Sequence, residues 1–372
     1  MMGVRILRDE RGAVVMWTAV SLGVLVAFAG LTTDIPYLYV ARQQAQTAAD
    51  AGALAGAYGL LLGTDQALTD ARAFARRTPI IGQSLSPGQV DVSLLSSDGS
   101  PSPDQVQCTT YRDATHGNPM PLFLLPILQL YGLGRTTADV SATATAKLSK
   151  SCGSFCFKPW SVADRWIDVN GNGKFDPGID RYVPSSEPGA TGYQYPADKG
   201  LQLTLKEGTP GGTIIPSFFN AVDFPPINRG TPITGAAAYR DNIATCAPPS
   251  FVAIGDQLLT EPGNLKGPTR LGVEALINLD PTAVWNTSCN CVDSRYGSNS
   301  ARLIRIAFFD PRFPPTPGRS SLSVINVGGF FLEDIRPNGD VIGRFTLVPS
   351  LGGASAPPGA ACTFLRTVQL VK

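Results

Sequence analysis

One uncharged stretch near the start of the chain, residues 12–33, most limits what this sequence can fold into. It reads GAVVMWTAVSLGVLVAFAGLTT and contains no Asp, Glu, Lys or Arg. A helix rises about 1.5 Å per residue, so a segment of this length can cross a hydrocarbon core about 30 Å thick. Arg5, Arg8 and Arg11 precede it, and basic residues are retained on the cytoplasmic side. We therefore expect a transmembrane helix at 12–33, a cytoplasmic tail at 1–11 and export of the rest.

Two other interpretations of this stretch compete with the anchor. Ala27-Phe28-Ala29 has the small-x-small form of a signal-peptide cleavage site. The apolar pattern continues past that site through Leu31, Ile35 and Leu38, which favours an uncleaved anchor. A buried core helix is disfavoured by the upstream arginines and by the lack of a polar face.

A stripe of small residues follows the apolar stretch. Alanine recurs at every fourth position, at Ala41, Ala45, Ala49, Ala53 and Ala57. Residues four apart share one face of a helix, so another element can approach this face closely. Two interpretations stay open: the stripe bundles with copies or related proteins, or it packs under this chain's own sheet. Pro36 predicts a kink near the membrane exit.

These residues also resemble a known family. Residues 11–57 are similar to the N-terminal module of TadE/TadG-like Flp (tight adherence) pilus assembly proteins. The likeness covers Arg11-Gly12, the apolar span, D-x-x-x-L-Y-x-A-R from Asp34, and Q-x-A-A-D-A-x-A-L-A-G-A from Gln46. Looser likenesses, the second to TadG-related C-terminal regions, cover 120–146 and 255–285. The resemblance implies a part of the pilus machinery at the cytoplasmic membrane, not an enzyme, with other pilus assembly subunits as partners.

One departure from that family's pattern bears on processing. Pseudopilins of this system are cut after a glycine that precedes a glutamate by five residues, but Trp17 stands five residues after Gly12. We therefore expect a permanently anchored, TadG-related protein.

Composition excludes some functions and favours others. Lys and Arg number 30 against 29 Asp and Glu, which gives no case for nucleic-acid binding. The 39 glycines and 31 prolines favour turns and short strands over a helical bundle. Seven cysteines in an exported chain predict disulfides with one cysteine left over.

Residues 34–150 have the pattern of a pilin-like module, a long helix laid on a small sheet. We expect helices to about Leu62 and over 65–77, with strands at 89–95, 106–111 and 139–148. Residues 122–130 are strongly apolar but too short to span a membrane. We expect a buried helix there, with a re-entrant or membrane-surface segment as the alternative.

Residues 151–372 predict an exported, strand-rich α+β domain. The expected strands are 201–206, 302–308, 322–331, 341–348 and 364–371, and the expected helices are 236–246 and 268–278. Asn338-Gly339 lies between two of these strands, and Asn-Gly is a strong hairpin signal.

Five of the cysteines are disulfide candidates: Cys152, Cys156, Cys246, Cys289 and Cys291. Cys152 with Cys156 and Cys289 with Cys291 are possible local bridges. A Cys-x-Cys bridge closes a very small ring, so we favour Cys289 or Cys291 pairing with a distant partner such as Cys246. A four-cysteine zinc site is the alternative.

One loop has the spacing of a calcium site. EF-hand-type loops place oxygen ligands at positions 1, 3, 5, 7 and 9, with glycine at position 6. The corresponding residues, with the backbone carbonyl at the fourth, are Asp168, Asn170, Asn172, Lys174 and Asp176. Gly173 takes the turn position, and Asp180 replaces the missing acid at the twelfth place, where Ile179 stands. The alternative is a plain Asx- and Gly-rich turn.

No catalytic set emerges. The chain has a single histidine, His116, which lies in a polar loop. Because there is no histidine elsewhere, no Ser-His-Asp or Cys-His group can be assembled. We expect no enzyme, no nucleic-acid partner and no small-molecule substrate. The predicted function is a structural or assembly subunit in the cytoplasmic membrane, single-pass, with its C-terminal domain in the periplasm or outside the cell. The alternative is a calcium-binding surface adhesin or ligand-binding protein that uses the same anchor.

Overall fold

The computed structural model describes residues 10–97, 99, 102–132, 134–208, 219–246, 249–357, 360 and 362–371. The expected α+β class is confirmed, with a long apolar helix followed by a strand-rich region. The chain forms two compact units. The first comprises Met1–Gly56, Leu68–Ala146 and Leu370–Lys372, and the second comprises Ala57–Ala67 and Lys147–Gln369.

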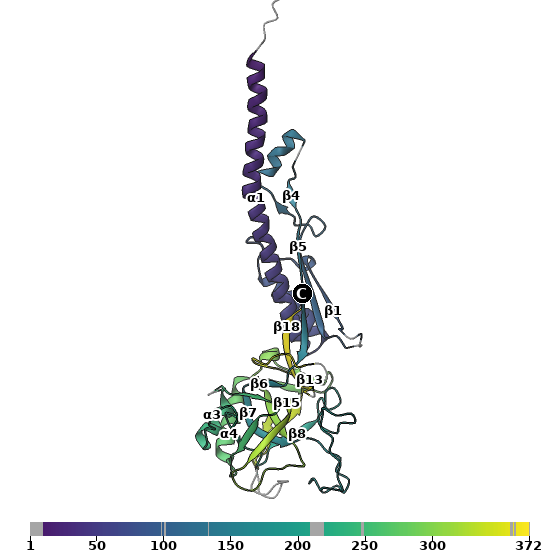
Figure 1. Ribbon diagram of the computed structural model, residues 1–372, viewed down its shortest axis with the longest axis vertical. Coiled ribbons are helices and arrows are strands. Elements are labelled where there is room, and N and C mark those ends of the chain that lie inside the picture. Colours follow the sequence, from purple (N-terminus) through teal and green to yellow (C-terminus); the bar gives the residue numbers. More distant parts are fainter. Residues whose placement is uncertain are drawn as a thin grey trace, which may run out of the picture. The chain divides into compact units, whose positions relative to one another are not determined.

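The first unit is built around helix α1 (Glu10–Gly59), which is continuous through Pro36 and ends three residues before the expected Leu62. Most of α2 (Thr64–Arg77) also belongs to this unit. The strands are β1 (Val90–Leu95), β2 (Gln105–Arg112), β3 (Met120–Pro121), β4 (Thr137–Ala138) and β5 (Val140–Lys150). In one sheet β2 lies between β1 and β5, and α1 runs alongside it (Figure 1). Two 3₁₀ turns complete the unit, η1 (Pro87–Gln89) and η2 (Leu125–Tyr131).

Alternation along β2 explains how this sheet meets the helix. Val106, Cys108, Thr110 and Arg112 are buried, and the residues between them are partly exposed. A strand turns successive side chains to opposite faces, so one face of β2 is a packing face. The Thr110 hydroxyl donates to the Ala45 carbonyl of α1 over 3.0 Å, which places that face under the helix.

The apolar segment 122–130 does not form the expected buried helix. It forms the end of a loop and the 3₁₀ turn η2, and none of residues 122–130 is buried. Pro126 lies within the first turn, and Gly132 ends η2 in a left-handed conformation. Because this prediction is wrong, the exposed apolar side chains need another explanation.

The second unit contains a seven-stranded sheet with β15 at its centre. Its strands are β7 (Phe157–Ala163), β8 (Gln202–Lys206), β9 (Val222–Asp223), β11 (Gln257–Thr260), β14 (Leu303–Phe309), β15 (Ser321–Ile335) and β16 (Val341–Phe345). β7 runs parallel to β14, and the other pairs are antiparallel. The expected hairpin is present, because Gly339 N–H donates to the Arg336 carbonyl between β15 and β16.

Smaller elements complete the second unit. They are β6 (Gly153–Phe155) with β10 (Phe251–Ala253), β12 (Val284–Asn286) with β13 (Cys291–Asp293), β17 (Val348–Pro349) with β18 (Leu365–Leu370), α3 (Ala236–Ala244), α4 (Lys266–Leu279) and η3 (Gly297–Asn299).

Both faces of the large sheet are covered, as β14 shows. Leu303, Ala307 and Phe309 enter one core cluster. Ile304, Ile306 and Phe308 enter a second cluster, which also contains side chains of α3 and α4. A strand buried on both faces is nearly continuously apolar, which is why residues 303–309, apart from the buried Arg305, lack alternation.

Candidate functional site

The first half of α1 has an apolar surface that nothing in the described chain covers. Large exposed side chains include Val15, Trp17, Leu25 and Phe28, each more than 60% exposed. Within Val14–Gly59 the most apolar 18-residue window is only 6% buried. The helix is long and apolar enough to cross a membrane, although an N-terminal signal sequence has the same length and composition. The low burial argues against the core helix of a soluble protein.

The second half of α1 reverses this arrangement. The alanines of the stripe are all 0% exposed: Ala41, Ala45, Ala49, Ala53 and Ala57. Gly52 shows how close the packing is, because a Cβ placed there would lie 2.6 Å from Cys108 Sγ and 3.0 Å from Ala75 Cβ. Packing within the chain therefore accounts for the small side chains. Bundling with other subunits stays a prediction.

Cys108 lies under this stripe. It is the free cysteine of the chain, in agreement with the odd count. Burial, with a smaller contribution from Asp91, raises the pKa of the Cys108 thiol to about 12. A protonated, enclosed thiol is unreactive, so Cys108 acts as a small apolar filler.

Asp34 marks the boundary between the two halves of α1. Its side chain is buried, and its carboxylate accepts hydrogen bonds from the backbone N–H groups of Phe123, Leu124 and Leu125 over 3.0, 3.1 and 2.8 Å. Carboxylates satisfy otherwise unpaired N–H groups at the start of a helical turn. Sequence reasoning assigned Asp34 only as the charge after the span. Its burial against a segment about 90 residues away could not be read from spacing.

The predicted calcium loop brings its side chains together. Asp168 accepts N–H groups of Gly171 and Gly173 over 2.8 Å each. The amide nitrogens of Asn170 and Asn172 donate to the same Asp176 oxygen over 2.7 and 2.6 Å. These two hydrogen bonds lower the pKa of Asp176.

The rest of this loop is engaged with its own backbone. Lys174 N–H donates to Asn172 Oδ1 over 2.7 Å. Asp180 accepts from the N–H groups of Val169 and Asp176 over 2.9 and 2.8 Å, so it closes the base of the loop. Among the described residues no group of three or more His, Cys, Asp and Glu side chains is placed to hold a metal ion. Calcium ligation by the Asp and Asn oxygens therefore stays a prediction.

The disulfides differ from the expected pairing. Cys152 bonds Cys362, Cys156 bonds Cys246, and Cys289 bonds Cys291. Of the two possible local bridges, Cys289–Cys291 is present and Cys152–Cys156 is not. The preference for Cys246 as the partner of Cys289 or Cys291 is wrong, and so is the four-cysteine zinc alternative. The turn at Asn290, which has a positive φ of 51°, lets the chain fold back between Cys289 and Cys291. Spacing alone could not show this turn or place Cys362 beside Cys152.

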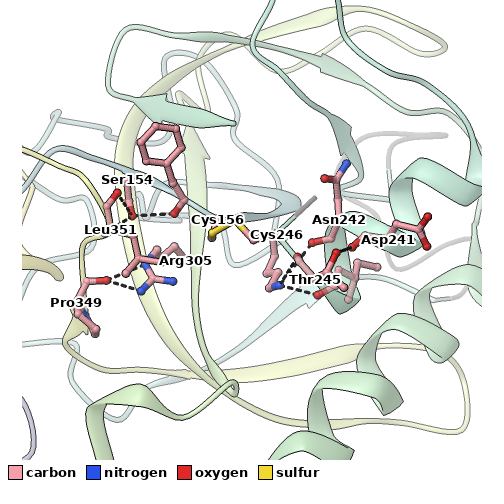
Figure 2. Close-up of a disulfide and its surroundings, with 12 residues drawn as sticks. Ser154, Cys156, Asp241, Asn242, Thr245, Cys246, Arg305, Pro349 and Leu351 are labelled. Atoms are coloured by element: carbon pink, nitrogen blue, oxygen red, sulfur yellow. Dashed lines mark hydrogen bonds between the residues drawn. A yellow bond between two sulfur atoms is a disulfide. The ribbon is translucent and has the colours of Figure 1, made fainter. Parts of the chain in front are cut away.

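The Cys156–Cys246 disulfide lies beside the C-terminal end of α3, whose last carbonyl groups accept hydrogen bonds from a lysine (Figure 2). The buried Lys158 ammonium donates to the carbonyls of Ile243 and Thr245, at the end of α3, over 2.6 and 3.2 Å. Burial, and to a lesser extent the charge of Arg305, lowers the pKa of Lys158 to about 7. Arg305 in turn donates to the Pro349 carbonyl. The Lys158 contacts therefore join β7 to the end of α3.

Two acidic side chains share one arginine at an end of the large sheet. Arg319 contacts Asp223 at 3.3 Å and Glu261 at 2.7 Å. Burial and the hydrogen-bonded, negatively charged Glu261 together raise the pKa of Asp223 to about 8, against the opposing charge of Arg319. His116 lies elsewhere, in the first unit, where it bonds Asp113 over 2.7 Å and stacks on Tyr111. Sequence reasoning gave no signal for the acidic pair, because its members are 38 residues apart.

Comparison with known proteins identifies the helix. Residues 12–59 match the model of the family described as putative Flp pilus-assembly TadE/G-like. No curated protein and no solved structure matches the chain. The matched range covers both halves of α1, the exposed apolar half and the alanine stripe. The match covers 48 of the 372 residues, and it coincides with the helix that is long and apolar enough to cross a membrane. Residues 12–59 are therefore similar to the TadE/G-like Flp pilus-assembly family.

Proposed function

We propose that this protein is a structural or assembly subunit of a Flp/Tad-type pilus system, anchored once in the cytoplasmic membrane. Residues 1–11 stay in the cytoplasm, and the chain beyond Asp34 lies in the periplasm or outside the cell. The observation that carries the proposal is the family match over 12–59, which coincides with the exposed apolar surface of α1. The three arginines before the span support this orientation.

Different parts of the chain serve different roles in this proposal, and their side chains indicate which. The exposed large residues of α1 suit a lipid environment, because the hydrocarbon core removes the cost of apolar exposure. The alanine stripe fixes the folded module to the end of the anchor, and the disulfides of the second unit suit an oxidising compartment outside the cytoplasm. The partners are other pilus-assembly subunits in the same membrane.

Topology and partners are tested in one strain. A C-terminal reporter that is active only outside the cytoplasm should be active, and full-length mass should appear in the membrane fraction. Crosslinking in the membrane should recover pilus-assembly subunits. Reporter activity only in the cytoplasm would overturn the orientation. A shortened soluble product starting near Gly30 would overturn the anchor in favour of a signal peptide. Full-length anchored protein without pilus partners would favour the surface adhesin alternative.

A further inference from the structure

The segment 122–130 presents apolar side chains that remain exposed in the folded chain. Phe123 is 57% exposed, Ile127 41% and Leu130 86%. A cluster of this kind on one short element usually marks a contact surface. The segment belongs to the first unit, as do residues 10–56 of α1, so its position on the helix is defined.

Hydrogen bonds fix the level at which this segment meets α1. The Asp34 carboxylate accepts three backbone N–H groups, from Phe123, Leu124 and Leu125. A Cβ on Gly30 would lie 3.0 Å from Leu125 Cδ2 and 3.5 Å from the Leu125 backbone nitrogen. Tyr37 packs edge-on against Phe123, with ring centroids 5.0 Å apart. The short coil of η2 therefore lies directly against α1 (Figure 1).

That level lies within the membrane span. Gly30 precedes Thr33, the last residue of the uncharged stretch, by three residues, which is less than one helical turn. If residues 12–33 cross the bilayer, Leu125 lies at the depth of the last turn of the span. The exposed side chains of α1 at this depth, Phe28 and Leu31, are 63% and 46% exposed, and they extend the same apolar surface.

Backbone chemistry is compatible with that depth. Polar backbone groups in or near hydrocarbon must be hydrogen-bonded within the protein. Asp34 accepts hydrogen bonds from three N–H groups at the start of η2. At the end of η2, Gly132 N–H donates to the Gln129 carbonyl. The carboxylate is itself satisfied by these donors, which explains a buried acid on an apolar helix.

We propose that residues 122–130 are a second membrane contact, an apolar hook that lies in the outer-leaflet interface of a phospholipid bilayer beside the anchor. Asp34 is its positioning residue, since it holds the hook at the level of Gly30. The hook sets the depth and tilt of α1 by adding a lateral contact at one side of its exit point. This inference depends on the anchor in the proposed function, and the test below separates the two.

The test measures depth at single sites on the full-length protein. Leu130→Cys places a thiol for a nitroxide label on the most exposed hook residue, with Phe28→Cys as the anchor reference and Leu95→Cys, on β1, as the control in the same unit. The native cysteines stay unlabelled, because six form disulfides and Cys108 is buried. The labelled protein is placed in nanodiscs of phosphatidylcholine and phosphatidylglycerol. Collision rates with oxygen and with a water-soluble nickel chelate are then compared.

We expect the oxygen-to-nickel accessibility ratio at Leu130 to be several-fold higher than at Leu95 and close to that at Phe28. Adding Asp34→Ala should return the Leu130 label toward the ratio at Leu95 while leaving the Phe28 label unchanged. A high ratio at Phe28 with a Leu95-like ratio at Leu130 would overturn the hook and leave the anchor. Low ratios at both sites would overturn the anchor and the hook together. Shielding of Leu130 from both reagents would indicate a protein partner and also overturn the hook.

Discussion

The interior of each unit is stabilised in a different way. In the first, the alanine stripe of α1 and Gly52 pack closely within the chain, and the cysteine beneath them is unpaired. In the second, three disulfides join distant and adjacent positions, and the interior contains charged groups such as Lys158, Asp164 and Asp223.

This difference teaches which perturbation each unit can tolerate. Close backbone contact through small side chains is sensitive to added volume, because interiors are packed without spare space. The first unit has no disulfide and few buried charged groups, so reductant and pH should change its stability little. The second unit should behave in the opposite way. Two probes report the units separately: labelling of the Cys108 thiol for the first, and tryptophan fluorescence for the second, which contains Trp160, Trp166 and Trp285. The fluorescence measurements use a Trp17→Phe background, because Trp17 belongs to the first unit.

The largest expected effect comes from removing the Cys152–Cys362 disulfide. This bond joins positions 210 residues apart, so it strongly restricts the unfolded chain. Cys152→Ser combined with Cys362→Ser should lower the free energy of unfolding of the second unit by about 2–5 kcal/mol. Denaturant titration should show an earlier fluorescence transition and an unchanged Cys108 labelling transition.

The matched control is Cys289→Ser with Cys291→Ser. That bond spans only two positions in sequence, so its loss should change the fluorescence transition much less. Equal losses in both double variants would show that the disulfides do not act by restricting the unfolded chain. An earlier Cys108 transition in either variant would break the separation between the units.

The next largest effect tests the first unit by adding volume. In Gly52→Val the new Cβ would lie 2.6 Å from Cys108 Sγ and 3.0 Å from the Ala71 carbonyl oxygen. Overpacking of this kind costs about 1–3 kcal/mol. Cys108 should become labelled at lower denaturant concentration, with the tryptophan transition unchanged. Thr47→Leu, on the exposed side of the same helix, is the control and should leave both transitions in place.

A related pair separates the two interpretations of the alanine stripe. Ala49→Leu with Ala53→Leu should destabilise the first unit if the stripe packs only within this chain. Normal Cys108 protection together with loss of crosslinking to pilus subunits would instead support bundling. Unchanged protection and unchanged crosslinking would contradict both interpretations and leave helix propensity as the reason for the alanines.

Much of this organisation could be predicted from sequence, for identifiable reasons. The apolar span, the stripe and the five expected strands of the second unit depend on local periodicity, and the structure places them within a few residues of expectation. The strands β7 and β11 of the large sheet were not predicted. The hairpin at Asn338-Gly339 depends on local turn chemistry and is also present. What failed depends on distant neighbours. Cys362 pairs across 210 residues, and segment 122–130 is apolar for a reason that its own sequence does not reveal.

The buried charged residues were not predicted for the same reason, because their partners are distant in sequence. Asp34, Lys158 and Asp223 are single charged residues in ordinary sequence contexts, and each is buried against groups from another element. Their partners are the backbone N–H groups of 123–125, the end of α3 and Glu261 with Arg319. Periodicity identifies faces of helices and strands, but it does not identify which buried charge meets which partner.

A smaller effect, specific to the second unit, follows from pH. The pKa of Asp223 is raised from an ordinary 3.8 to about 8, so the folded unit retains a proton that the unfolded chain releases. Stability from this group is present below about pH 4 and lost as pH rises to about 8. Asp164, with a pKa raised to about 6 by burial, acts in the same direction. Lys158, with a pKa lowered to about 7, acts in the opposite direction above pH 7.

We therefore expect the fluorescence transition to move to lower denaturant concentration between pH 5 and pH 8, with a smaller change in Asp223→Asn. The Lys158 contribution is common to both proteins and cancels in the difference. Asp241→Asn, a substitution of an exposed acid, is the control. Identical pH slopes in the Asp223→Asn variant and the unaltered protein would contradict the assignment. The Cys108 transition should change little over this range.

The smallest expected effect is calcium binding by the loop from Asp168 to Asp180. With two neutral amide ligands the affinity should be weak, with a Kd of about 10⁻⁴–10⁻³ M. At 5 mM calcium and a Kd near 10⁻³ M, linkage gives about 1 kcal/mol of added stability. Binding requires Asn170 and Asn172 to turn their oxygens toward the ion, since their amide nitrogens now face Asp176. Calorimetry on the full-length protein should show one binding event, with a later fluorescence transition and no change in Cys108 labelling. Asp168→Ala should abolish both effects, and Asp241→Asn should retain them. The absence of heat and of any shift at several millimolar calcium would leave an Asx- and Gly-rich turn, closed at its base by Asp180.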